Sequence, residues 1–154
     1  IIASYTKQLI LLPGILLMLP GFLEMRGNIS GAFASRLSAG LFLGVVKPRF
    51  RETRIIKGNL LASFFFAIVI SFTLGLLAFF FNLLVFDIFT LKIILLPLIA
   101  GLIANLIEIP LALLATFYIF RKGHDPNNII GPFITSSGDL ISVFSLFIVM
   151  GLLL

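Results

Sequence analysis

Apolar residues fill four long stretches of this chain, and short polar stretches separate them. We predict membrane-spanning helices over residues 16–44, 58–85, 91–120 and 129–154. Each stretch is long enough, because a hydrocarbon core about 30 Å thick requires roughly 20 residues of helix. We expect a further piece of chain before residue 16, near the outer surface. The alternative for the first stretch is a pair of spans that breaks at Gly27 and Asn28.

The composition of the chain also indicates a membrane protein. Of the 154 residues, 60% are hydrophobic and 11% are charged, which excludes an ordinary soluble domain and a disordered chain. The short alternating strands typical of outer-membrane barrels are absent from the sequence. We therefore predict an all-α membrane protein, a polytopic helical bundle whose helices are interrupted by Pro and Gly. We treat residues 1–154 as a single transmembrane domain.

Positive charge gathers in two of the connections. Loop 45–57 carries five Lys and Arg against one Glu, and loop 121–128 begins with Arg121 and Lys122. The positive-inside rule predicts that both loops are cytoplasmic, in a multi-pass protein of the plasma membrane. Because the net charge of +5 lies largely beside helix ends, we interpret it as topology and expect no nucleic acid partner. The first loop could also bind the headgroups of membrane lipids.

Asp139 is the first candidate for a functional group. It lies within the last predicted span, where a carboxylate costs on the order of 2.5–3.5 kcal/mol on insertion scales. Thr135, Ser136 and Ser137 precede it, and Gly131 and Pro132 are expected to unwind the helix partly, which would free carbonyl oxygens. Such an oxygen-lined, anionic segment suits a hard cation. The competing interpretation is a carboxylate bound to nearby hydroxyls, or paired with Arg26 or Arg36.

Polar residues also interrupt the first apolar stretch. Asn28 follows Gly27, and its carbonyl could bind Mg²⁺ or the water around it, or could simply join helices. Glu24 could be a ligand, but we favour a pair between Glu24 and Arg26.

The third and fourth predicted spans add further candidates. Asn105 and Glu108 lie three residues apart and should share a helix face, where Glu108 is either a second intramembrane acid or a packing residue. Asp125 precedes Pro126, a pattern typical of a turn or a helix N-cap, and could also lie at the cytoplasmic mouth of a pathway. Hydrolase triads, phosphate-binding loops and zinc motifs are absent, so we expect no enzyme.

Two segments together resemble the MgtE family of magnesium channels and its eukaryotic solute-carrier relatives. Residues 26–38, RGNISGAFASRLS, resemble the glycine-asparagine signature. Within them, residues 34–38, ASRLS, are closer to the solute-carrier branch. Residues 124–143, HDPNNIIGPFITSSGDLISV, resemble the Asp-Pro turn and the last helix with its central Asp. The sequence departs from the bacterial pattern at Ser30, Gly31 and Ala32, and Gly131 replaces a common Asn.

The resemblance implies a five-helix domain that works as a homodimer, with a pore lined by the second and fifth helices. It implies that Asp139 helps to hold partly hydrated Mg²⁺ and that Asn28 is the signature amide. Thr135 matches a position whose backbone carbonyl faces the ion, and Asp125 matches the Asp of the turn. Since the chain starts at Ile1 without Met, we expect that the first helix lies upstream and is missing here.

We therefore hypothesise a transmembrane domain that moves Mg²⁺ or another divalent cation, with a metal site formed by Asp139, Asn28, Thr135, Asp125 and Glu24. Two alternatives remain at this point. One is a proton- or sodium-coupled secondary transporter of another substrate, and the other is a scaffold bundle that transports nothing.

Overall fold

The computed structural model describes residues 13–48 and 54–153. This part of the chain forms four long α-helices joined by short connections. They are α2 (Pro13–Phe42), α3 (Arg54–Phe86), α4 (Lys92–Arg121) and α5 (Pro126–Leu153). The expected piece before residue 13 and the centre of the first basic loop, residues 49–53, lie outside the described residues.

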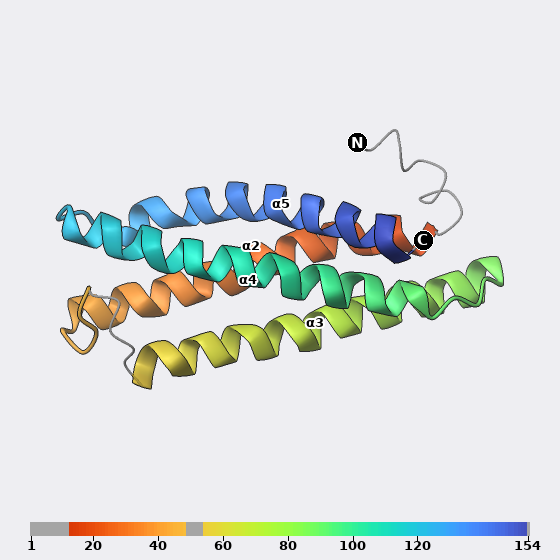
Figure 1. Ribbon diagram of the computed structural model, residues 1–154, viewed down its shortest axis with the longest axis horizontal. Helices are drawn as coiled ribbons and strands as arrows, with labels where there is room; N and C mark the ends of the chain where they lie inside the picture. The colour runs from red at the N-terminus through yellow and green to blue at the C-terminus, as the bar shows by residue number, and fades with distance from the viewer. Residues whose placement is uncertain (1–12, 49–53, 154) are drawn as a thin grey trace.

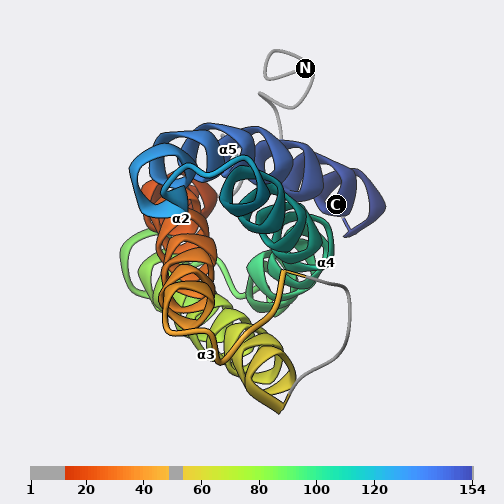
Figure 2. The same cartoon turned by 90° about the vertical axis from the view of Figure 1, so that its left-hand side faces the viewer.

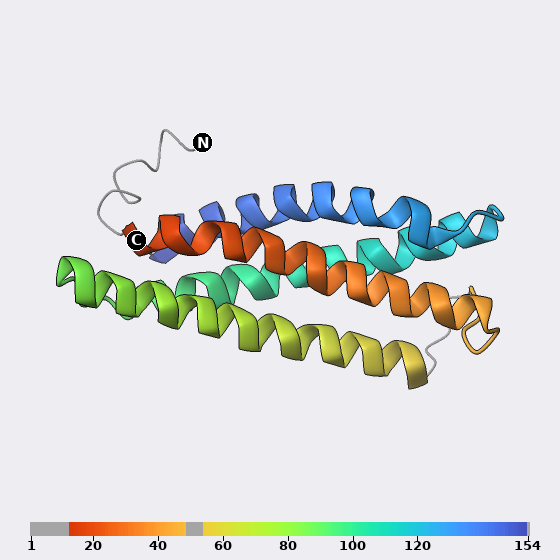
Figure 3. The ribbon, with the colours of Figure 1, turned by 180° about the vertical axis from the view of Figure 1, so that it is seen from behind.

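The helices lie side by side as an elongated bundle (Figure 1). Seen along its length, α2 and α4 face each other across the middle, while α3 and α5 lie on opposite sides and do not contact each other (Figure 2). From behind, α2 runs between α3 and α5 and has an outward face of its own (Figure 3). The pairing of α2 with α5 is the contact that positions the candidate site.

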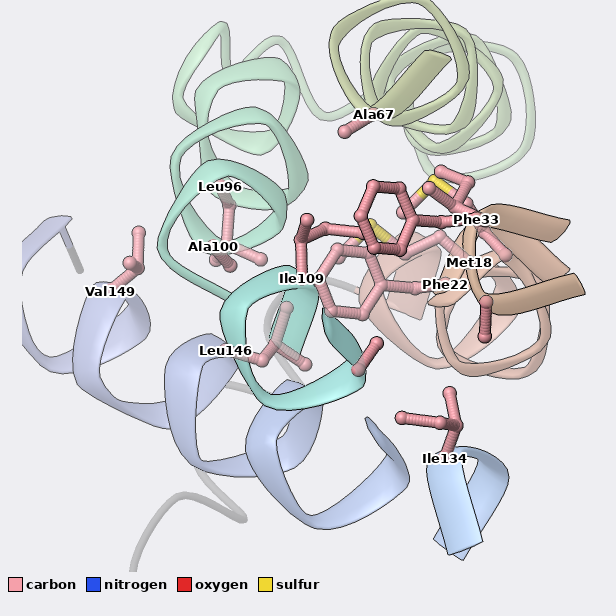
Figure 4. Close-up of a cluster of buried hydrophobic side chains, with 14 of the residues drawn as sticks. Met18, Phe22, Phe33, Ala67, Leu96, Ala100, Ile109, Ile134, Leu146 and Val149 are labelled. Carbon is pink, nitrogen blue, oxygen red and sulfur yellow. The ribbon is translucent and has the colours of Figure 1, made fainter. Parts of the chain in front are cut away.

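The core fills the space among the four helices with large apolar side chains. Phe22 and Phe33 of α2 belong to the same core as Leu96 and Ile109 of α4, and all are less than 2% exposed (Figure 4). Residues of this core recur every three or four positions along each helix, the spacing that places them on one face. The interior is therefore packed with apolar side chains, as in a soluble helical protein. Large apolar side chains are also exposed on the outer surface of the bundle.

Small residues allow two of the closest helix contacts. Gly14, at the start of α2, donates its backbone N–H to Asn82 Oδ1 of α3 at 2.7 Å. Gly75 of α3 lies against the backbone of α4, where an added Cβ would come within 2.8 Å of the Ile94 Cα. Such close approach between backbones is typical of helices that pack in lipid.

The structure confirms the predicted helical class and corrects one detail. α2 continues through Gly27 and Asn28, which confirms a single first helix and excludes the alternative of two spans. α5 continues through Gly131 and Pro132, so the predicted partial unwinding is wrong. A long helix can contain a single proline, because its other intrahelical hydrogen bonds and its packing keep the segment helical.

Three of the described helices, α3, α4 and α5, are long and apolar enough to cross a membrane. α2 is of similar length, but Glu24, Arg26 and Asn28 lower its hydropathy. The two basic connections lie at the same end of the bundle, where the Arg121 side chain donates hydrogen bonds to the Pro48 carbonyl. This arrangement agrees with the prediction that both loops are on one side.

Candidate metal site between α2 and α5

A polar hollow lies on the outward side of the bundle, between the middle of α2 and the middle of α5. Its volume is about 230 Å³. We call it the α2–α5 hollow, and its lining consists of Pro20, Leu23, Glu24, Gly27, Asn28, Thr135 and Asp139. Four of the five predicted ligand residues therefore meet at one place, although the two from α2 lie more than 100 positions before the two from α5 in the sequence.

The α2 side of the hollow consists of residues one helical turn apart. Asn28 Nδ2 donates a hydrogen bond to Glu24 Oε1 at 3.2 Å, and both side chains are exposed at the surface of the single chain. This bond turns the amide carbonyl of Asn28 away from Glu24, so that it is available to a cation or its water. A carboxylate and a carbonyl oxygen are both ligands that Mg²⁺ prefers.

The α5 side supplies Thr135 and Asp139, again one turn apart. The Thr135 hydroxyl donates to the Gly131 carbonyl at 3.0 Å, which leaves its oxygen lone pairs free to accept. In a continuous helix the backbone carbonyl of Thr135 is already bonded within the helix. The hydroxyl is thus the oxygen that Thr135 offers to the hollow in this structure.

Gly27 lies at the contact between the two helices. A Cβ built on Gly27 would lie 3.6 Å from Thr135 Oγ1, an ordinary van der Waals contact, so the backbone of α2 passes close to the threonine here. A side chain much larger than a methyl group at this position would enter the hollow that Gly27 lines. The glycine beside the signature amide therefore shapes the hollow.

A second hollow of about 230 Å³ continues the same groove toward the end that carries the basic loops. Its lining is mostly small or apolar, with Ser35 and Asn127 as the polar side chains: Gly31, Ala34, Ser35, Pro126, Asn127, Ile130 and Gly131. The groove between α2 and α5 thus extends from mid-helix to the start of α5. Its most polar part is the α2–α5 hollow at mid-helix.

Asp125 lies apart from the α2–α5 hollow, at the loop end of the bundle. Its Oδ1 accepts a hydrogen bond from the Asn127 backbone N–H at 2.9 Å. This is the geometry of an N-cap, with Pro126 at the first helical position. The N-cap interpretation of Asp125 is confirmed, and the side chain does not join the other four candidates.

Arg26 is the residue that the sequence analysis misplaced. It pairs neither with Glu24 nor with Asp139, and is instead fully buried, donating to the Gly101 carbonyl at 2.6 Å and to Asn105 Oδ1 at 3.1 Å. The helical spacing of the residues could have predicted the inward position of Arg26. Residues two apart point to nearly opposite sides of a helix, whereas Arg26 shares its face with Phe22 and Phe33.

Glu108 and Asn105 occupy the interior face of α4, as their spacing predicted. Both are 0% exposed, and Glu108 lies against Gly138 of α5, where an added Cβ would overlap Glu108 Oε1. Glu108 is therefore buried directly behind the helix that carries Asp139.

A family model described as MgtE, divalent cation transporter, matches residues 19–149 of this chain. The match contains all four helices in part or in full, and it includes the whole α2–α5 hollow. Searches among curated proteins and among solved structures gave no match.

Proposed function

The chain belongs to the MgtE family of divalent cation transporters, and we propose that it moves partly hydrated Mg²⁺ through a pore lined by α2 and α5. The observation that carries this proposal is the meeting of Glu24, Asn28, Thr135 and Asp139 around one hollow at mid-helix depth. Mg²⁺ gives up its water reluctantly and binds through one or two carboxylates together with water. The hollow offers that ligand set and has room for water.

We further propose that two copies face each other across this groove. Glu24 and Asn28 are exposed in the single chain, and a carboxylate facing lipid at mid-membrane costs about 2.5–3.5 kcal/mol. A second copy placed over the α2–α5 groove would remove both groups from lipid and would bring a second pair of acids to the cation. Gly31 and Ser35 on the same side are small enough to permit close approach.

In this proposal the two basic loops are cytoplasmic and the protein belongs to the plasma membrane. Arg54 and Lys57 begin α3 at the same end of the bundle as Arg121 and Lys122, which supports one positively charged side. Asp125 then lies at the cytoplasmic mouth of the groove, as an N-cap rather than a ligand.

The test is Mg²⁺ flux in proteoliposomes loaded with a magnesium-sensitive dye. We expect Asp139→Ala and Asp139→Asn each to reduce flux at least about tenfold, the effect of losing ~1.4 kcal/mol of interaction. Asp87→Asn is the matched control, because Asp87 lies in the connection after α3, away from the groove. Wild-type flux in both Asp139 variants would remove this carboxylate from the mechanism.

Thermal unfolding separates this function from a scaffold that transports nothing. A transporter with a metal site should unfold at higher temperature as Mg²⁺ is added, and Asp139→Asn should abolish that rise. A scaffold should be indifferent to Mg²⁺. A proton-coupled carrier would instead show flux that follows a pH gradient without any divalent ion.

The sequence contains no cysteine, which makes the dimer directly testable. We expect Ser35→Cys, on the exposed groove side of α2, to form disulfide-linked dimers on mild oxidation in membranes. Phe72→Cys, on the exposed face of α3, is the control and should remain monomeric. Equal cross-linking of the two variants would contradict a dimer that forms across the groove.

A further inference from the structure

Within residues 13–48 and 54–153, two ionisable side chains are fully buried inside the bundle, directly behind the α2–α5 hollow. Arg26 and Glu108 are each 0% exposed. Arg26 is fixed to α4 through the Gly101 carbonyl and Asn105 Oδ1, at 2.6 and 3.1 Å. Charged groups are seldom taken out of solvent to this degree unless they are paired, because removal from water is unfavourable.

Both buried charges are attached to the helix segments that line the hollow. Arg26 lies between Glu24 and Gly27 in α2, on the opposite side of the helix from the hollow. The carboxylate of Glu108 lies against Gly138, the residue before Asp139. The absence of a side chain at Gly138 is what lets a carboxylate from α4 reach the backbone of α5 at this level.

The charges act on each other and on the hollow without direct bonding. The Ser30 hydroxyl of α2 faces the Glu108 carboxylate, and neither Ser30 Oγ nor the two carboxylate oxygens has another hydrogen-bond partner among the described residues. The charged groups that act on Glu108 are Arg26, with the opposite sign, and Asp139, the residue after Gly138 in α5, with the same sign. In surroundings poor in water, such interactions reach further than they do at a protein surface.

Local stability does not explain this arrangement. A buried carboxylate whose hydrogen-bonding neighbour is a single serine hydroxyl lowers stability, and apolar residues of similar volume would pack the same space at least as well. A positive and a negative charge do, however, set the potential at a neighbouring cation site. With both present their fields largely cancel, and with one removed the remaining charge acts alone on the hollow.

We propose that Arg26 and Glu108 form an internal charge-balanced pair that sets the cation affinity of the α2–α5 hollow from behind. This proposal rests on the proposed cation transport. Neither residue touches the ion. Glu108 adds negative potential that favours cation entry, and Arg26 opposes it so that a bound cation can leave again.

The test measures the Mg²⁺ concentration that gives half-maximal flux in proteoliposomes. Glu108→Gln leaves Arg26 unbalanced, so we expect this concentration to rise by roughly threefold to tenfold. Arg26→Gln removes the positive charge that opposes cation binding, so we expect it to fall by a similar factor at a pH high enough to keep Glu108 ionised. The double variant, which is again balanced, should return close to the wild-type value.

Two further variants separate charge from packing. Arg26→Lys keeps the charge and loses the guanidinium geometry, so thermal stability should fall while the half-maximal concentration stays within about twofold of wild type. Ser142→Ala changes a buried neutral side chain of α5 and should leave that concentration unchanged. If Arg26→Gln does not fold, Glu108→Gln and Arg26→Lys still give the decisive pair of values.

Shifts of the same sign in both single variants, or no shift in Glu108→Gln, would overturn the charge-balance proposal. Those outcomes differ from failure of the transport proposal, in which Asp139→Asn would itself retain flux. If Asp139→Asn abolishes flux while Glu108→Gln and Arg26→Gln behave alike, transport stands and only the charge-balance proposal is lost.

Discussion

α2 and α3 are of similar length and lie next to each other, yet they present opposite chemistry to the outside. From Gly58 to Phe86, α3 has no charged residue, and its exposed side chains include Phe65, Phe72 and Leu84. The outward side of α2 carries Glu24 and Asn28. An apolar exterior suits acyl chains, whereas a carboxylate at the same depth needs water, a cation or another polar surface.

The contrast shows that the hydropathy of a helix does not indicate how much it contributes to the α2–α5 hollow. The most hydrophobic helix, α3, contributes nothing to the hollow. The helix that does not qualify as a span by composition contributes most of the lining. In a membrane protein, the least apolar helix is where a polar pathway can be lined.

The largest expected effect comes from moving an acid onto the apolar face. Phe72→Asp would expose a carboxylate to acyl chains near the middle of α3, lowering the free energy of unfolding by about 2.5–3.5 kcal/mol. Gly31→Asp, on the groove side of α2, should lower it by less than about 1 kcal/mol, since groups that face a watery cavity are tolerated. SDS titration of the chain in bicelles measures both, and equal losses would mean that the two faces meet the same surroundings.

A smaller effect is expected from adding one methyl group to each helix. Gly75→Ala would push a Cβ against the α4 backbone and should destabilise the bundle by about 1–3 kcal/mol. In the single chain a Cβ at Gly31 meets nothing within 4 Å, so Gly31→Ala should stabilise α2 of the monomer by about 0.5–1 kcal/mol. Thermal unfolding in detergent measures the two changes. A destabilising Gly31→Ala would show that the groove side of α2 is already covered in detergent.

The smallest expected change in free energy separates function from fold. Asn28→Leu makes the outward side of α2 resemble α3, and we expect Mg²⁺ flux to fall about tenfold, equivalent to ~1.4 kcal/mol. Its unfolding temperature should stay the same or rise, because no buried contact is lost. Phe72→Leu is the matched control and should change neither quantity. Full flux in Asn28→Leu would exclude the amide from the pathway.

Much of the fold could be predicted because it follows from local chemistry. Long apolar stretches must form helices in lipid, where backbone groups have no water to bond, and charged connections must remain outside. Helix bounds came within a few residues of the structure, and α5 began at Pro126 with Asp125 as its cap. Continuity through Gly27 was the favoured prediction, whereas continuity through Pro132 was not predicted, because local sequence marks a proline as a breaker and does not contain the packing around it.

By itself, the sequence determined a bundle of membrane helices, the family and the candidate oxygen ligands, since residue type and order carry that information. Only the tertiary structure decided which polar groups meet. It brought Asp139 and Thr135 to Asn28 and Glu24, left Asp125 at the helix start, and turned Arg26 inward. The reason is that the packing of α2 against α3, α4 and α5 fixes which side of each helix faces the groove, and spacing along one chain does not contain that relation.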